Sequence, residues 1–156
     1  EKMLIRGVTK DTDVARISVT KIPNTPGVAF KLFDVLAKHK INVDIILQSI
    51  GRESTKDITF TVSKSNADET VECVKNLFDI EDENIICDTS VAKISIVGAG
   101  MESHPGTASK MFEALYERDI NIDMIATSEI KISVLINLED ADRAVSAIHK
   151  AFFPAE

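Results

Sequence analysis

Few side chains in this sequence have the types and spacing that catalysis or metal binding requires. The three histidines lie far apart, at His39, His104 and His149. None is followed two to four residues later by a second potential ligand, so local spacing assembles neither a zinc site nor a catalytic triad. Gly98 and Gly100 match the first two glycines of a dinucleotide fingerprint, but Ser103 stands where the third belongs. We therefore predict no catalytic residues and no metal site, and we assign these glycines to chain bending.

Two motifs that each occur twice are better candidates for binding. Pro26-Gly27 recurs as Pro105-Gly106, and Asn42-Val43-Asp44 recurs as Asn121-Ile122-Asp123. A helix that opens after Pro-Gly presents unsatisfied N–H groups and a positive dipole end, which suit a carboxylate. We expect each turn and the start of the following strand to lie at neighbouring ends, so that Asn42 or Asn121 supplies amide groups near that carboxylate. Such a site fits an amino acid; alternatively, the motifs only start helices and strands.

The motifs belong to an internal duplication of the sequence. Residues 14–19 recur as 91–96, a shift of 77 positions, and residues 41–46 recur as 120–125, a shift of 79. After Ser49 the shift falls to 74, which predicts a longer hairpin loop, 51–57, in the first copy.

Hydrophobic periodicity predicts the same elements in both copies. Apolar residues at i, i+3, i+4 and i+7 predict a helix after each Pro-Gly, and similar spacing predicts a second helix in each copy, at 67–78 and 141–152. Between the two helices, alternation over 41–48 predicts a strand with one covered face. With a final strand, each copy is a ferredoxin-like βαββαβ unit of the α+β class, with antiparallel sheets and helices on one face.

Only the first unit carries its own final strand, at 84–88. The segment 3–8 has the composition of a strand, and an unpaired sheet edge is a liability. We therefore predict that this N-terminal strand completes the second sheet. The first unit is then 14–90, and the second is 1–13 plus 91–156.

Composition excludes several classes of function. Eighteen Lys and Arg against 25 Asp and Glu give a net charge of −7, which disfavours nucleic acid and anionic membranes. No apolar run approaches the roughly 20 residues that span a bilayer. Cys73 and Cys87 form no C-x-x-C pair, and the start lacks a secretory signal, so we expect the cytoplasm. Because the sequence begins with Glu1, we expect a piece of a longer protein.

The sequence resembles the tandem ACT domains that form the regulatory part of aspartate kinase, either its C-terminal portion or a separate small subunit. In the second unit the resemblance rests on Gly98–Met101, Ser103–Gly106, Ile120–Ile125 and Thr127–Val134. In the first unit it rests on Asn42–Ile46, Gln48 and Thr55–Phe60.

The resemblance implies a sensor and not an enzyme. Aspartate kinase phosphorylates the side-chain carboxylate of aspartate with ATP, the first step towards lysine, threonine and methionine, and that chemistry belongs to a kinase domain that this sequence lacks. The chain itself is then expected to have no catalytic residue and no cofactor. Its implied partners are a second copy, with which it forms a homodimer, and the catalytic domain or subunit. Threonine or lysine is expected to bind at the seam between unit one of one chain and unit two of the other.

The resemblance also implies two sets of effector-binding residues. The first pocket is expected to use Asn24, Gly27, Val28, Ala29 and Gln48, closed by Asn121 and Ile122 of the partner subunit. The second is expected to use Met101, His104, Gly106, Thr107, Ala108 and Ser128, closed by Asn42, Val43 and Asp44 of the partner subunit.

Two details of these pockets bear on the choice of effector. Relatives often carry Asp where this chain has Asn24, so the first pocket loses a charge-assisted bond to an ammonium group. The pockets also look short, and the second lacks a carboxylate for a lysine tail, which favours threonine. The alternatives are a ligand-free ACT-type interaction module, a small subunit of another amino-acid biosynthetic enzyme, and a small enzyme on the same fold.

Overall fold

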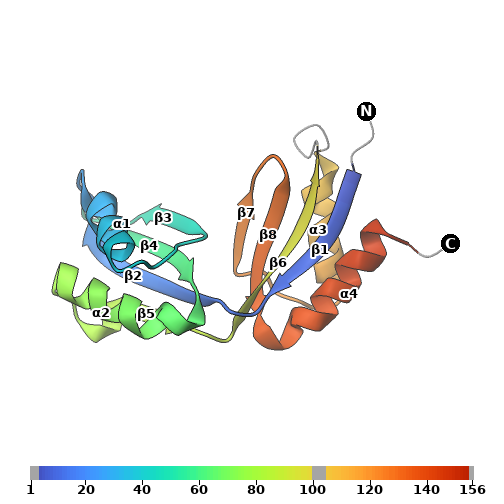
Figure 1. Ribbon diagram of the computed structural model, residues 1–156. Helices are drawn as coiled ribbons and strands as arrows, with labels where there is room; N and C mark the ends of the chain where they lie inside the picture. The colour runs from blue at the N-terminus through green and yellow to red at the C-terminus, as the bar shows by residue number, and fades with distance from the viewer. Residues whose placement is uncertain (1–3, 100–104, 155–156) are drawn as a thin grey trace. The chain divides into compact units, whose positions relative to one another are not determined.

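The duplicated sequence folds into two units, each an antiparallel four-stranded sheet with two helices (Figure 1). The computed structural model describes residues 4–99 and 105–154. The first unit contains β2 (Ala15–Pro23), α1 (Val28–Lys38), β3 (Ile46–Ile50), β4 (Thr55–Val62), α2 (Ala67–Phe78) and β5 (Ile85–Asp88). The second contains β1 (Leu4–Asp11), β6 (Val91–Ala99), α3 (Gly106–Tyr116), β7 (Met124–Thr127), β8 (Lys131–Asn137) and α4 (Ala141–Phe152). The predicted α+β, ferredoxin-like class is confirmed.

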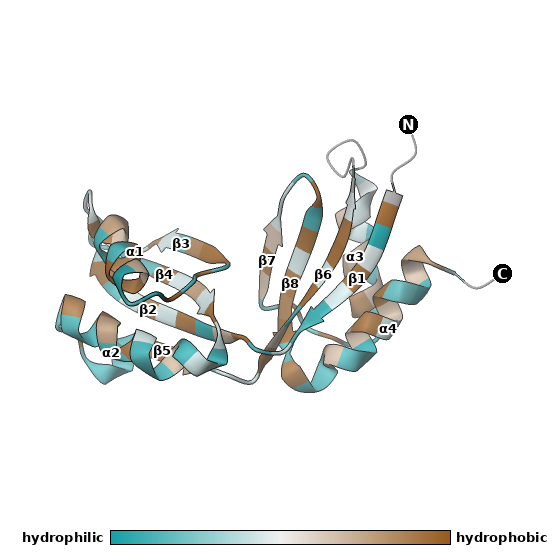
Figure 2. Ribbon diagram, in the orientation of Figure 1, coloured by the Kyte–Doolittle hydropathy of each residue, from teal (hydrophilic) through white to brown (hydrophobic). Residues whose placement is uncertain are grey.

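Each unit has its own apolar core between its sheet and its helices. In the first, Leu32 and Leu36 of α1 are fully buried with Ile58 and Phe60 of β4, and the rings of Phe33 and Phe60 meet edge to face at 5.6 Å. In the second, α3, α4, β6 and β8 enclose an equivalent cluster. Apolar and polar positions alternate along the central strands (Figure 2), because a helix layer covers one face of each sheet.

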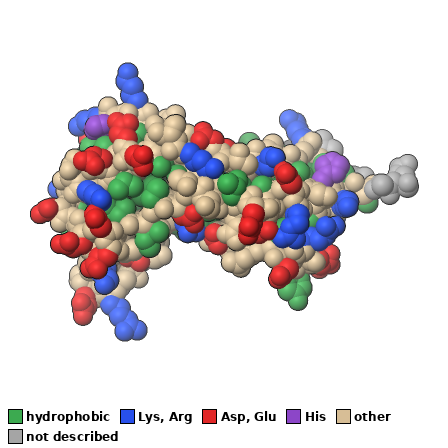
Figure 3. All heavy atoms as spheres, turned by 90° about the horizontal axis from the view of Figure 1, so that it is seen from below, with side chains coloured by type: hydrophobic (Ala, Val, Ile, Leu, Met, Phe, Trp, Pro, Cys, Tyr) green, Lys and Arg blue, Asp and Glu red, His purple; other side chains and the backbone are tan. Residues whose placement is uncertain are grey.

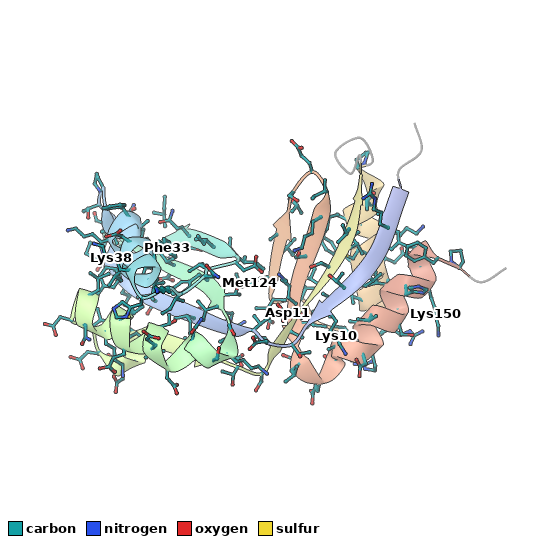
Figure 4. The ribbon with its side chains drawn as sticks, viewed as in Figure 1. Lys10, Asp11, Phe33, Lys38, Met124 and Lys150 are labelled. Atoms are coloured by element: carbon teal, nitrogen blue, oxygen red, sulfur yellow. The ribbon has the colours of Figure 1, made fainter. Side chains whose placement is uncertain are left out.

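The N-terminal strand belongs to the second sheet. β1 pairs antiparallel with β6, from Leu4 opposite Ala99 to Asp11 opposite Lys93. The strand orders are β1-β6-β8-β7 and β3-β4-β2-β5, so β1 holds beside β6 the place that β5 holds beside β2. Lys10, which is labelled in Figure 4, also pairs through its Nζ with Asp142 of α4 at 2.8 Å.

The boundaries between the two units agree with the placement of β1 in the second sheet. One unit runs from Asp13 to Thr89, and the other joins the residues up to Thr12 to those from Ser90 onward. The sequence had placed these boundaries one residue later. Among the helices of the described residues, none is long and apolar enough to cross a membrane.

Two local predictions were wrong. The second strand of each unit begins at Ile46 and at Met124, later than the alternation over 41–48 predicted. The residues before β3 form a loop that leaves the end of the first helix. There the N–H of Ile41 donates to the carbonyl of Leu36 at 2.9 Å, and the rest of the loop makes only isolated hydrogen bonds to the sheet. The apolar residues there alternate because the loop anchors Ile41 and Ile45 in the interior, not because it is a strand.

The predicted hairpin loop 51–57 is also shorter in the structure. β4 begins at Thr55, and the N–H of Gly51 donates to the carbonyl of Thr55 at 2.8 Å. Glu53 and Ser54 adopt left-handed conformations, with φ of 58° and 61°, which close the turn in four residues. The added residues relative to the second unit therefore extend the strands as well as the loop.

Candidate functional site

The first Pro-Gly turn stands where β2 passes into α1. The N–H of Asn24 donates to the carbonyl of Ser54 at 2.8 Å, which holds the turn against the β3–β4 hairpin. Gly27 has φ of 90° and precedes the first helical residue, Val28, and no side chain caps the helix. A φ of this sign is easy only for glycine. The N–H of Val28 donates to the carbonyl of Thr25 at 3.5 Å, and because no side chain caps the helix, the next N–H groups, including that of Ala29, remain available to a ligand or to water.

Gln48 lies on the same face of the sheet as α1. It stands opposite Ile58 on β4, and residues directly opposite each other share a face. Ile58 and Phe60 pack into the core beneath α1. The structure therefore brings the Pro-Gly turn and Gln48 to one corner of the first unit, with Gln48 exposed at the edge strand.

The Asn-x-Asp motif lies at the other end of the same unit, contrary to our expectation. The N–H of Asp44 donates to the carbonyl of Thr61 at 3.1 Å, and Thr61 stands opposite Arg16 at the start of β2. The turn follows Pro23, which stands opposite Thr55. Thr55 and Thr61 are separated by about 20 Å of strand. The helix reverses the chain before β3, so β3 starts at the end of the sheet from which β2 starts, and Asn42 does not reach the turn of its own unit.

The second unit repeats this arrangement. Gly106 begins α3, Thr107 is buried and Ala108 is half-buried. Ser128 closes the β7–β8 hairpin through an N–H bond of 2.8 Å to the carbonyl of Lys131. The N–H of Asp123 donates to the carbonyl of Leu135 at 2.8 Å, which again puts the Asn121-Ile122 segment at the far end. Met101 and His104 lie outside the described residues.

Ionisable side chains make isolated surface contacts in the parts of the chain that the structure describes. Groups of three or more His, Cys, Asp or Glu that could hold a metal are absent from those parts. Nδ1 of His39 lies 3.0 Å from Oε1 of Glu69, and the ring of His149 stacks near that of Phe153 at 5.0 Å. Both histidines are exposed. Acidic and basic side chains are interspersed over the face shown in Figure 3.

A hollow of about 350 Å³ lies elsewhere, between α3 and α4. Its floor includes Ala114, Ala147 and Ala151. The aligned positions in the first unit are Val35, Cys73 and Leu77, which have larger side chains and pack in the core of that unit. None of the predicted effector residues lines this hollow, so it reflects smaller helix-contact residues and not the predicted site.

Sequence reasoning missed one charged residue at the first corner. Lys56 of β4 is only 8% exposed. It stands opposite Ile22, just before the Pro-Gly turn, and opposite Ile50 on the edge strand. Its position two residues before Ile58 was visible in the sequence, because period-two alternation places both side chains on the covered face.

Comparison with known proteins finds the same family in both units. The ACT domain model matches residues 17–78 and 94–152, once in each unit. The chain belongs to the ACT domain family. Each match stops short of the edge strands β5 and β1, so the model recognises the βαββα portion that the two units share.

Similar ACT pairs occur in aspartate kinases. The ligand-free regulatory subunit of aspartate kinase from Thermus thermophilus superimposes with a TM-score of 0.88 and 41% identity, over 95% of this chain and 98% of that one. The aspartate kinase from Synechocystis gives a TM-score of 0.85 and 39% identity, over 97% of this chain and 27% of that one. The aspartate kinase of Pseudomonas fluorescens (strain SBW25) is 43% identical over 153 residues.

The extent of these matches defines what the chain corresponds to. The match spans 97% of this chain but only 37% of the Pseudomonas fluorescens relative. The matches are to the regulatory ACT part of aspartate kinase and not to its catalytic kinase domain. The predicted resemblance to this regulatory part is confirmed.

Proposed function

We propose that this ACT pair is the amino-acid sensor of an aspartate kinase, binding free threonine in preference to lysine and thereby inhibiting the kinase. The observation that carries the proposal is its 41% identity to a regulatory subunit of aspartate kinase across 98% of that subunit. The reaction controlled would be ATP-dependent phosphorylation of aspartate by a catalytic domain or subunit, with which the ACT pair would assemble. The two free thiols, Cys73 and Cys87, fit a reducing cytoplasm.

The opposite placement of the two motifs supports a pocket built from two chains. One unit does not close its own Gly27 turn, because its Asn42-Val43-Asp44 segment lies at the other end of the sheet. In a homodimer, Asn121 and Ile122 of the partner subunit would close the turn at Gly27, and Asn42, Val43 and Asp44 of the partner subunit would close the turn at Gly106.

Exposed apolar edge strands also support pairing with a second copy. On β3, Ile46 is 50% exposed, Leu47 is 42% exposed and Ile50 is 79% exposed. On the edge of the other sheet, Ile125 of β7 is 44% exposed. Unpaired edges that carry apolar side chains favour pairing with another chain.

The regulatory effect would follow from differential binding. An effector held across the seam binds one arrangement of the paired units better than another, and only that difference in affinity shifts the kinase. Coupling free energies of this kind are about 1–3 kcal/mol. Two seams that act independently would supply about twice that amount.

Titration calorimetry on this chain, combined with sedimentation, tests the proposal. Threonine and lysine are titrated separately and as a mixture, and we expect saturable heat with threonine, weaker heat with lysine, and a dimer in sedimentation. A monomer that gives no heat with either amino acid would favour the alternatives, namely a ligand-free interaction module or a small subunit of another biosynthetic enzyme.

A further inference from the structure

Lys56 is a lysine in a place where lysine is rarely found. Its side chain is 8% exposed, whereas lysines are almost never buried unless paired. The pairing of β4 with β3 is regular, so Lys56 shares the helix-covered face with Ile58 and Phe60. Both of those residues belong to the core beneath α1. The side chain therefore points to the α1 side of the sheet.

No partner for this cation exists in the described part of the first unit. Nζ of Lys56 has no ion pair or side-chain hydrogen bond there. The adjacent carboxylate, Asp57, lies on the opposite face and accepts the N–H of Lys21 at 3.0 Å. Every fully buried side-chain nitrogen or oxygen among the described residues has a partner, so Nζ, which has none, still reaches the surface. The stem is covered and the charged tip keeps contact with solvent.

Strand pairing places Lys56 beside the Pro-Gly turn. Lys56 stands directly opposite Ile22, two residues before Asn24, and Asn24 is tied to Ser54 by a bond of 2.8 Å. The uncapped start of α1 at Val28 is reached within a few residues of the same turn. A helix N-terminus and a lysine are both positive, so together they favour an anion between them.

We infer that Nζ of Lys56, with the first-turn N–H groups of α1, binds the carboxylate of an amino-acid effector whose side chain carries no positive charge. This inference rests on the proposed sensor function and specifies the ligand of its first pocket. The neutral Asn24 at the same turn offers no negative charge to the second ammonium group of lysine, and the ammonium group of Lys56 repels it.

The duplicate unit lacks this group. Lys56 aligns with Ile130, which is 58% exposed. The two pockets therefore differ in charge although they share the Pro-Gly turn. We expect the first pocket to bind the carboxylate more tightly than the second.

Calorimetry on the whole 156-residue chain tests the assignment with three proteins: wild type, Lys56→Met and Lys64→Met. Methionine retains a flexible apolar stem but has no charge. Lys64 lies beyond the far end of β4 and serves as the matched control. We expect Lys56→Met to weaken threonine binding at one class of site by about 10- to 100-fold, the range for a bond to a charged group. The ratio of threonine to lysine affinity should fall with it, and Lys64→Met should match wild type. Circular dichroism checks folding.

A second measurement separates this inference from the proposed function. The side-chain NMR resonances of Lys56 and Lys64 are followed in wild type as acetate, a bare carboxylate, is added. Saturable shifts at Lys56 but not at Lys64 are expected. If wild type binds no amino acid yet Lys56 responds to acetate, the sensor proposal fails and the carboxylate site stands. The assignment is overturned if a folded Lys56→Met protein keeps the wild-type threonine affinity, or if acetate does not shift the Lys56 side-chain resonances.

Discussion

The two units share their central βαββα portion but differ in the strand that completes one edge of each sheet. Both contain the same βαββα portion, which the ACT model matches twice. Beside the first central strand, unit one uses β5, a four-residue strand that follows its own last helix. Unit two uses β1, an eight-residue strand from the far end of the chain. The sheet edge needs a strand, and its origin in the chain is secondary.

The comparison also separates architecture from chemistry. The two Pro-Gly turns occupy equivalent positions, but only the first has an adjacent buried lysine. Within each unit, the Asn-x-Asp segment lies far from the turn. Duplication therefore copies the fold, while the binding properties of each copy depend on a few side chains at one corner. The following experiments compare the units directly.

Deletion of residues 1–12 should have the largest effect, and only on the second unit. It removes β1 and with it Ile5 and Val8, which pack against that core, so we expect a loss of at least about 3 kcal/mol and unfolding of unit two. Hydrogen exchange would show unprotected amides in β6 and β8 and retained protection in β2 and β4. Full protection of β6 in the truncated chain would contradict the assignment of β1.

Matched core truncations come next. Leu32 and Met111 are aligned, and both side chains are fully buried under their own sheets. Leu32→Ala and Met111→Ala should each cost about 2–5 kcal/mol, because each leaves a cavity. Hydrogen exchange should show loss of protection only in the unit that carries the substitution. Phe30→Ala, at a position 71% exposed, is the control and should change stability by less than about 0.5 kcal/mol.

The paired glycines should respond with opposite signs. Gly27 has φ of 90°, so Gly27→Ala should destabilise unit one by about 1 kcal/mol although no atom lies within 4 Å of the added Cβ. Gly106 is the first residue of α3 and also has open space, so Gly106→Ala should be neutral or stabilise unit two by up to about 1 kcal/mol. Urea denaturation measures both. Equal losses would show that the two turns share one backbone conformation.

The pH dependence of stability that comes from the cysteines should affect unit one alone, and it is the smallest effect that we expect. Burial, followed by Glu69 and Glu72, raises the pKa of Cys73, whose aligned residue in unit two is Ala147. The folded thiol keeps its proton above the unfolded value, so its contribution to stability is full below about pH 8.5 and is lost as pH rises through the folded pKa. Urea titrations above and below that pH should show a decline that Cys73→Ala reduces.

The rate of thiol labelling provides a second reading of the same prediction. Cys87 is exposed on β5, but partial desolvation of its thiol, followed by the charges of Asp68 and Asp88, raises its pKa. We expect Cys87 to react with iodoacetamide more slowly than a free thiol, and Cys73 to react only when unit one opens. Equal labelling rates in the native chain would contradict the burial of Cys73.

The sequence predicted local elements better than it predicted distances between them. The second helix of each unit contains the periodic apolar residues that predicted it, because apolar periodicity is a local property. The late start of β3 was not predicted. Ile41 and Ile45 lie in a loop, but both are buried, so their spacing resembles the alternation of a strand. The separation of Asn42 from Gly27 was missed as well, because it depends on the direction in which β3 enters the sheet.

By itself, the sequence determined the duplication, the α+β class and the motifs that resemble the regulatory part of aspartate kinase, because repeats, periodicity and turn residues are written in neighbouring positions. The tertiary structure alone decided which ends of the sheets the motifs occupy and that Lys56 is buried beside the first turn. Those facts depend on strand register and on the packing of α1 over β4, which join residues that the chain keeps far apart.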